Sequence, residues 1–379
     1  MIIRRRPHYP LLVLLSLLAL APATHAQPAP DIAAKSYLLS DFQSGQTLVG
    51  HSVDTRVEPA SLTKLMTSYL VFAALKQKRI TPTQTVPVSE NAWRTSGSRM
   101  FIDPKKAVSV EELLRGMIVQ SGNDATIALA EAIAGTEAAF AKMMNSEAER
   151  LGLKNTHYVN ATGLPDAQHY TSASDLVVLA AALLRDFPEH YPLYAVKEYQ
   201  YNDITQPNRN RLLWLDPHVD GLKTGHTESA GYCLIASAKR GERRLIAVVL
   251  GAASDTARTI ESQRLLNHGF QHFETVRLYQ QGQAVVSMPL WKGAETAIKA
   301  GFNRDFYYTL PTGMANKLQA TATYPQPLFA PITAGDKIGR FKLALDGKAV
   351  AEYPLAALET VPLGNIFGRA WDSLRLMFD

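Results

Sequence analysis

Ser61 and Lys64 are the first residues in this chain whose types and spacing suggest covalent chemistry. Pro59 precedes them, and the apolar rhythm that follows predicts a helix whose first turn carries Ser61. Residues three apart on a helix share a face, with Cβ atoms roughly 5–6 Å apart. A serine hydroxyl needs a base to act as a nucleophile, and a lysine is one only when burial or nearby positive charge lowers its pKa. The pair predicts a nucleophile with its own base; a helix start with a solvated lysine is the alternative.

Two later motifs carry residue types that would complete such a site. Ser121-Gly122-Asn123 lies at the junction of two predicted helices, where a hydroxyl and a carboxamide can project into a cleft. Lys223-Thr224-Gly225 lies on a predicted strand, where Gly225 would let a substrate backbone lie against the strand edge. Each motif alone is a weak signal. The ordered set Ser-x-x-Lys, Ser-x-Asn and Lys-Thr-Gly, each on a suitable element, is a strong one.

The elements that must position these motifs are a block of helices between early and late strands. The sequence predicts a strand pair near residues 35–50, helices over 61–78, 109–120, 124–134, 137–152 and 172–184, an antiparallel meander over 222–250, and a helix over 259–273. Ser109 to Glu112 and Ser172 to Asp175 have the pattern of capping boxes. This order predicts an α+β domain whose early and late strands share one sheet.

Beyond residue 274 the pattern changes to short strands punctuated by proline and glycine, which predicts a small all-β domain over 274–363. In 364–379, Ile366, Phe367, Trp371, Phe378 and other apolar residues form one stripe of an amphipathic helix. The aromatic content favours a helix that lies in a membrane interface. A lid over the all-β domain is the alternative.

Residues 1–26 have the pattern of a secretory signal peptide, with three arginines at 4–6, an apolar run over 11–21 and a small-residue cleavage pattern before Gln27. The run is shorter than the ~20 residues of a membrane-spanning helix, so a cleaved signal is favoured over a retained anchor. Removing the three arginines lowers the formal net charge from +5 to +2, which gives no basis for a nucleic-acid partner. Cys233 is the only cysteine, so no intramolecular disulfide can form, and we expect an inert core thiol.

With these motifs in order, the sequence resembles the penicillin-binding serine peptidases, and within them the low-molecular-mass D-alanyl-D-alanine carboxypeptidases. The resemblance extends to Pro207–Trp214 and Val219–Thr227 and covers nearly the whole mature chain. It implies a penicillin-binding, β-lactamase-like transpeptidase domain over 27–273, the all-β domain over 274–363 and a membrane-anchor helix over 364–379. It also implies an exported enzyme of cell-wall maturation on the periplasmic side of the inner membrane, with no cofactor and no metal.

The resemblance implies roles for five residues at the reacting bond. Ser61 would attack the carbonyl between the two terminal D-alanines of a peptidoglycan stem peptide, and Lys64 would take its proton. A cluster of Lys64 with Lys223 could keep one lysine neutral. Asn123 would bind Lys64 and the substrate, and Ser121 would pass a proton to the leaving amine. β-Lactams would acylate Ser61 as covalent inhibitors.

It also implies how the rest of the substrate is held. The backbone N–H groups of Ser61 and His226 would form the oxyanion hole. Thr224, with Arg258 and Arg209, would bind the carboxylate of the terminal D-alanine. For the two arginines, a solvated surface position is the alternative.

Three other functions remain as alternatives. A β-lactamase of the same fold would need a deacylating base, but residues 158–170 offer Asp166 and no glutamate, and Gly122 stands where those enzymes carry aspartate. A zinc peptidase could cut the same bond, yet the ten histidines include no His-Glu-x-x-His or other tight ligand grouping. The third alternative is a non-catalytic wall-binding protein that keeps the fold.

Overall fold

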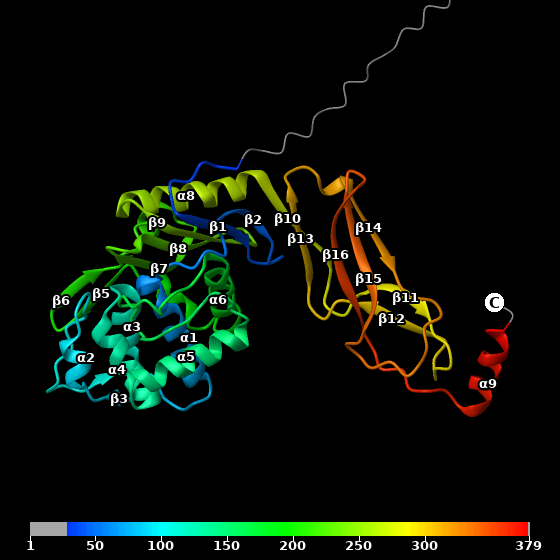
Figure 1. Cartoon of the computed structure of the whole chain (residues 1–379), viewed down its shortest axis with the longest axis horizontal. Coiled ribbons are helices and arrows are strands. Elements are labelled where there is room, and N and C mark those ends of the chain that lie inside the picture. Colours follow the sequence, from blue (N-terminus) through cyan, green and yellow to red (C-terminus); the bar gives the residue numbers. More distant parts are fainter. Residues whose placement is uncertain (1–28, 378–379) are drawn as a thin grey trace, which may run out of the picture.

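The N-terminal domain is built on a five-stranded antiparallel sheet, seen in a computed structural model that describes residues 29–377 (Figure 1). The strand order is β2-β1-β9-β8-β7. The strands are β1 (Ser36–Asp41), β2 (Thr47–His51), β7 (Val219–Thr227), β8 (Gly231–Arg240) and β9 (Arg243–Ala252). Because β1 pairs with β9, the early strand pair and the late meander share one sheet, as predicted. This order leaves β7 as an edge strand.

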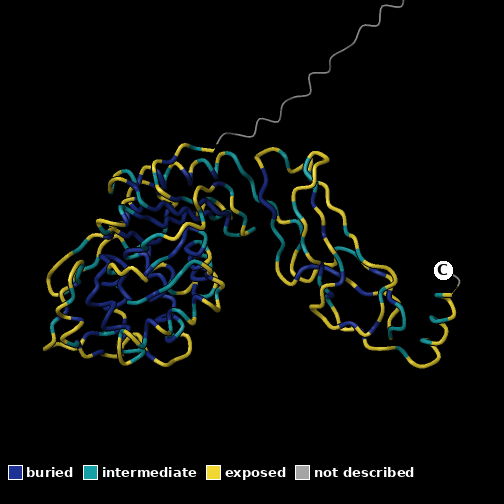
Figure 2. Tube along the Cα trace, in the orientation of Figure 1, coloured by how far each residue is buried: buried dark blue, intermediate teal, exposed yellow. Residues whose placement is uncertain are grey.

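The central strands are buried on both faces, because helices cover each side of the sheet (Figures 1 and 2). On β9, Ile246 and Val248 pack with the helical block, while Leu245 and Val249 pack under α8 (Asp255–His272). Side chains on a strand alternate between faces, so this unbroken apolar run serves two cores. The block consists of α1 (Lys64–Lys76), α2 (Glu90–Arg94), α3 (Val110–Val119), α4 (Asn123–Ala134), α5 (Glu137–Leu151) and α6 (Ala173–Asp186).

Two helix starts in the block carry the predicted capping signals, and one of the two needs a correction. At α3, Ser109 Oγ accepts from Glu112 N and the Glu112 carboxylate accepts from Ser109 N, which completes the predicted box. At α6, Ser172 Oγ accepts from Asp175 N, but the Asp175 carboxylate accepts from Asn155 N at 2.7 Å instead of closing the box. Asp175 therefore ties the start of α6 to the loop that follows α5.

Several short elements complete this domain. They are the 3₁₀ turns η1 (Ala60–Thr63) and η2 (Tyr191–Ala195), the small pairs β3 (Thr85–Val86) with β4 (Val108–Ser109) and β5 (Glu198–Tyr201) with β6 (Ile204–Pro207), and the single turn α7 (Leu212–Leu215).

The C-terminal domain is all-β, with a five-stranded sheet in the order β11-β12-β16-β15-β14 and a separate pair, β10 with β13. Its strands are β10 (Phe273–Tyr279), β11 (Ala284–Pro289), β12 (Ala297–Gly301), β13 (Phe306–Pro311), β14 (Leu318–Thr323), β15 (Lys337–Leu345) and β16 (Lys348–Ala357), with a 3₁₀ turn η3 (Ala315–Lys317). The sequence predicts strands near 284–286, 306–308, 320–324, 338–345 and 348–353, and it misses β10 and β12. β10 starts directly after α8 with no turn residue between them, so the pattern of the helix hides it.

A buried polar cluster joins the two domains where β10 leaves α8. The Asp41 carboxylate accepts from Thr275 Oγ1 at 2.6 Å and from Arg243 Nε at 3.0 Å. Asp41 is fully buried, so its charge is compensated by these donors instead of by water. The junction is therefore a specific contact between the domains as well as a linker.

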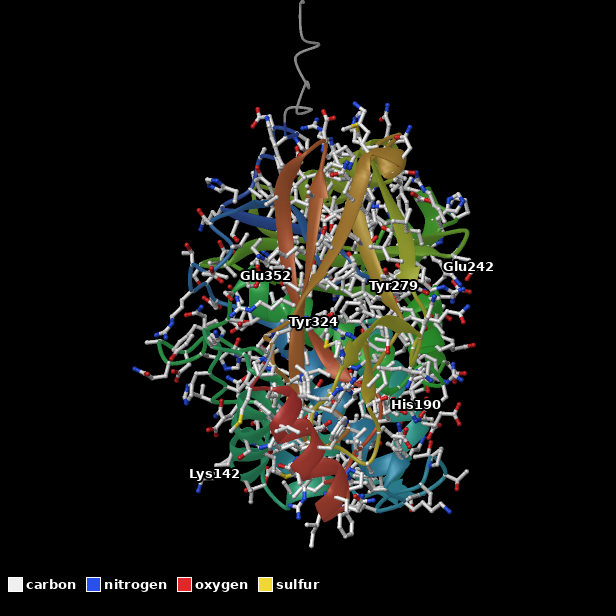
Figure 3. The ribbon with its side chains drawn as sticks, turned by 90° about the vertical axis from the view of Figure 1, so that its right-hand side faces the viewer. Lys142, His190, Glu242, Tyr279, Tyr324 and Glu352 are labelled. Carbon is white, nitrogen blue, oxygen red and sulfur yellow. The ribbon has the colours of Figure 1, made fainter. Side chains whose placement is uncertain are left out.

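The last helix, α9 (Ile366–Arg375), stands beyond the β domain and has no buried residue (Figures 1 and 3). Asn365 caps it by accepting from Gly368 N at 2.7 Å. Phe367 is 85% exposed and Trp371 59% exposed, so the apolar stripe does not cover the β-domain core. A bond from Lys292 N to Asp372 tethers the helix. Residues 1–26 and Phe378, which the sequence assigned to the signal peptide and the stripe, lie outside the described residues. Within 29–377, every helix is too short or too polar to cross a membrane.

Candidate active site

Ser61 lies in η1, immediately before α1, and this turn packs against β7. The sequence prediction of an α-helical first turn is therefore corrected to a 3₁₀ turn. Gly225 also has a packing role that the sequence did not predict: a Cβ there would lie 3.0 Å from Pro59 O and 3.2 Å from Ala60 Cβ. The missing side chain makes room for the turn that carries Ser61, so the nucleophile can sit beside the strand edge.

Lys64 is buried, with 1% of its surface exposed, and its Nζ has three oxygen neighbours. Nζ lies 3.0 Å from Ser61 Oγ, 2.7 Å from Asn123 Oδ1 and 2.6 Å from the Thr162 carbonyl oxygen. Burial lowers the pKa of Lys64 to about 7, and the positive charge of Arg209 acts in the same direction. The alternative of a solvated lysine is therefore excluded, and a neutral Lys64 amine is accessible near neutral pH.

Asn123 determines which way the Lys64 lone pair points. Its Nδ2 donates to Ser96 O at 2.7 Å, so its Oδ1 is the atom that faces Lys64. A neutral amine has two N–H groups and one lone pair, and a carboxamide oxygen and the Thr162 carbonyl can only accept. These two acceptors take both N–H groups. The lone pair is then left for the third neighbour, the Ser61 hydroxyl, which is the geometry of a general base.

Thr162 is the functional residue that the sequence reading missed. Its carbonyl is presented by a tight turn in which Asn160 Oδ1 accepts from Thr162 N at 3.1 Å and Gly163 N at 2.7 Å. Every residue has a backbone carbonyl, so a search for motifs of side-chain types cannot identify this one. The one sequence signal for this turn was the glycine at 163. Its φ of +86° favours glycine, and the absent side chain lets the turn approach Ala60.

Ser121 and Lys223 complete the set of predicted catalytic side chains. Ser121 connects α3 to α4 with a φ of +70°, a strained conformation of the kind found at functional sites. Its Oγ is buried and has no hydrogen-bond partner. Lys223 Nζ donates to the Thr224 carbonyl at 3.1 Å. Burial holds the pKa of Lys223 well below its usual range, and the charges of Lys64 and Arg209 add to the effect.

Seven of the ten predicted site residues line one cleft of about 420 Å³, and the other three, Lys64, Asn123 and Lys223, are buried and are not among its lining residues. The lining residues are Ser61, Gly97, Ser98, Ser121, Arg209, Thr224, Gly225, His226, Tyr232, Asp255 and Arg258. The sequence reading did not single out Gly97, Ser98, Tyr232 or Asp255.

The two arginines of the cleft are held in place by a backbone hydrogen bond and by an ion pair. Arg209 Nε donates to Gln120 O at 3.1 Å, and Arg258 pairs with Asp255. His226 is exposed and stacks on Tyr232, with ring centroids 3.9 Å apart. Arg258 is 6% exposed, so the alternative of a solvated surface arginine is wrong for this residue.

Residues 158–170, where the sequence offered Asp166 as a possible deacylating base, place no such base beside Ser61. Asp166 is exposed, and its carboxylate accepts from Gln168 N at 2.7 Å within the same turn. Across residues 29–377, no three or more His, Cys, Asp or Glu side chains gather in a way that could hold a metal ion.

Comparison with known proteins gives a consistent result for both domains. Residues 22–254 match the D-alanyl-D-alanine carboxypeptidase family, and residues 273–363 match the C-terminal domain of penicillin-binding protein 5. D-alanyl-D-alanine carboxypeptidase DacA of Escherichia coli K12 is 42% identical over 92% of this chain and 89% of its own length. DacF of Bacillus subtilis is 37% identical over 92% of each chain.

Solved structures extend the likeness to the arrangement of the fold. Penicillin binding protein 5 from Haemophilus influenzae is 42% identical, covers 88% of this chain and 99% of its own, and superposes with a TM-score of 0.86. Penicillin-binding protein D2 of Listeria monocytogenes, solved in an ampicillin-bound form, is 30% identical over 64% of this chain and all of its own, with a TM-score of 0.60. With its site geometry, its two domain matches and these relatives, the chain belongs to the D-alanyl-D-alanine carboxypeptidase family of serine peptidases.

Proposed function

We propose that this enzyme removes the terminal D-alanine from peptidoglycan stem peptides through an acyl-enzyme at Ser61. The observation that carries the proposal is the position of Lys64 Nζ, 3.0 Å from Ser61 Oγ, with its two other neighbours both acceptors. That geometry supplies a neutral amine whose lone pair faces the hydroxyl, as general-base activation of a serine requires.

Acylation follows from the positions of the cleft residues. Ser61 Oγ attacks the penultimate D-alanine carbonyl as its proton passes to Lys64. The N–H groups of Ser61 and His226 hold the developing oxyanion at the edge of β7. Ser121 Oγ, buried without a partner, hands its proton to the leaving amine and takes up the proton that Lys64 received from Ser61, so Lys64 is neutral again when the ester has formed. Thr224 and Arg209 bind the carboxylate of the departing D-alanine.

Hydrolysis of the ester then regenerates the enzyme with the same base. Water attacks the acyl carbonyl, gives a proton to Lys64 and releases the shortened peptide as Ser61 recovers its hydroxyl proton. β-Lactams, one of which is bound in the Listeria relative, would acylate Ser61 in the same way. Asp166 is not placed to activate that water, so we expect the β-lactam adduct to persist.

Release of D-alanine from a stem pentapeptide tests this function. We expect release by the wild-type chain, loss of it in Ser61→Ala, and a stable β-lactam adduct on Ser61 by mass spectrometry. Full activity should remain in a chelator. Rapid turnover of a penicillin would instead indicate a β-lactamase, and adduct formation without D-alanine release would indicate a non-catalytic wall-binding protein.

We also propose that an N-terminal signal over 1–26 exports the chain, with the peptidase domain over 27–273 and the β domain over 274–363. The segment 364–379 would lie in the periplasmic surface of the inner membrane. Exposure of Ile366, Phe367 and Trp371 on one stripe of α9 supports this placement. Each large apolar side chain that enters the interface would contribute roughly 1.5–3 kcal/mol before ordering costs.

Deletion of residues 364–379 tests the anchor. The truncated protein should no longer sediment with membranes, and its hydrolysis of a soluble peptide should be unchanged. Phe367→Ser with Trp371→Ser should have the same effect without shortening the chain. Continued sedimentation of both variants would contradict the proposal.

A further inference from the structure

Arg258 uses Nη1 of its guanidinium to bind the protein backbone and part of Nη2 to bind the Asp255 carboxylate. It lies in the first turn of α8 and is 6% exposed. Nη1 donates to Gly225 O at 3.1 Å and to Cys233 O at 3.4 Å, and Nη2 pairs with Asp255. Nε is buried without a partner. Only one N–H of Nη2 remains for a substrate, so Arg258 cannot give a carboxylate the two parallel bonds of a bidentate grip.

The two carbonyls that share Nη1 determine how the Gly225–His226 peptide is turned. Gly225 of β7 and Cys233 of β8 stand opposite each other in the antiparallel ladder. One nitrogen can reach both oxygens only where both carbonyls point into the space between the two strands, as they do in a hydrogen-bonded pair. The Gly225 carbonyl therefore points toward β8.

A planar trans peptide directs its N–H opposite to its carbonyl. The His226 N–H belongs to the same peptide as the Gly225 carbonyl, so it points away from β8. β7 is an edge strand, and on that side lies the cleft lined by Ser61, Gly225 and His226. Fixing the Gly225 carbonyl thus aims the His226 N–H into the cleft beside the nucleophile.

A stack of cleft-lining side chains supports the same peptide. The Arg258 guanidinium lies over the Tyr232 ring at 5.5 Å, and the opposite strand partner of Tyr232 is His226, whose ring stacks on it at 3.9 Å. Because β7 has no further strand on its free side, the contacts from Arg258 replace part of the restraint that a second neighbour would give.

We propose that Arg258 is a positioning residue for the oxyanion hole: it holds the Gly225 carbonyl so that the His226 N–H points at the substrate carbonyl oxygen. This role rests on the proposed function and differs from carboxylate binding, which falls to Thr224 and Arg209. A residue that binds the substrate carboxylate affects only substrates that carry one, whereas a residue of the oxyanion hole affects the reaction of every acyl donor.

The test compares two acyl donors with the same D-alanyl group: a peptide ending in D-alanyl-D-alanine, and a thioester whose leaving thiol has no carboxylate. We expect Arg258→Ala to lose about 10- to 100-fold in kcat/KM on both, mainly in kcat, below the 10²–10³-fold cost of deleting a donor outright. Its affinity for a peptide boronic acid, which forms a tetrahedral adduct on Ser61, should fall by a similar factor. Arg258→Lys, which can still donate to the Gly225 carbonyl, should recover part of each loss.

Two control variants separate the possible roles. Thr224→Val should lose activity on the peptide and keep it on the thioester. Arg264→Ala removes a half-exposed arginine of the same helix and should match wild type on both donors. All rates are divided by the concentration of enzyme that a β-lactam acylates, so unfolded protein does not count.

An Arg258→Ala variant that loses activity only on the peptide, with boronate affinity intact, would overturn the positioning role and return Arg258 to carboxylate binding. A wild-type chain that no acyl donor modifies at Ser61 would overturn the proposed function as well.

Discussion

Gly163→Ala tests whether the turn after α5 must approach η1 for Lys64 to act. A Cβ at this position would lie 1.8 Å from the Ala60 carbonyl oxygen and 2.8 Å from Thr63 Oγ1. Contacts this short force the turn away by more than about an ångström, since overlapping atoms in a packed core must move. The Thr162 carbonyl is only 2.6 Å from Lys64 Nζ, so such a shift breaks that bond.

The magnitude has two parts, and a second glycine separates them. The φ of +86° costs an alanine about 1–2 kcal/mol, and overpacking adds about 1–3 kcal/mol, so urea denaturation should show a loss of about 2–5 kcal/mol. Gly152→Ala carries a similar φ of +77° with nothing within 4 Å, so it should lose the first part alone. Acylation of Ser61 by a β-lactam should fall about 100-fold in Gly163→Ala, the effect of misplacing a catalytic contact by an ångström, and stay unchanged in Gly152→Ala.

If a β-lactam acylated Ser61 of a correctly folded Gly163→Ala protein at the wild-type rate, this reasoning would be refuted. It would mean that the Thr162 carbonyl does not hold an N–H of Lys64 during the reaction.

Three further predictions concern charge. The acylation rate should rise with pH through about 7 and then level off, because Lys64 must be neutral to accept the proton of Ser61; a rate independent of pH between 5 and 9 would contradict this. Since the pKa of Lys64 falls from 10.5 to about 7 on folding, the unfolded chain binds more protons between these values, so stability should rise with pH across that window. Urea denaturation should show a shallower rise in Lys64→Met. Asp124 is buried and accepts N–H bonds from Met100, Phe101, Ile102 and Ala125, so Asp124→Ala should lower stability by roughly 2–4 kcal/mol in the same assay, and a loss below about 0.5 kcal/mol would count against it.

The sequence predicted those parts of the site that depend on side-chain chemistry. Ser61, Lys64 and Asn123 could be placed in one site because a nucleophile, a base and a carboxamide rarely occur by chance in that order on those elements. The Thr162 carbonyl could not be predicted, since every residue carries one. The direction of the Arg258 guanidinium also lay out of reach, because it depends on the register of β7 against β8.

The fold was predicted where local signals and tertiary packing agree. The capping box at Ser109 and the apolar run of β9 could be predicted from the sequence. The first N–H groups of a helix need hydrogen-bond acceptors, and a strand buried on both faces needs apolar side chains. Asp175 completed the same pattern at α6, but its carboxylate found better donors in a loop twenty residues away. β10 was missed because no turn separates it from α8, and only its pairing with β13 makes it a strand.

The protonation of Lys64 is the central claim, and its direct measurement is an NMR titration of the Lys64 side chain in ¹³C-lysine protein, assigned with Lys64→Arg. A midpoint near 7 would support a neutral base facing Ser61. A midpoint near the ordinary value of 10.5 would leave Lys64 charged at neutral pH and contradict it.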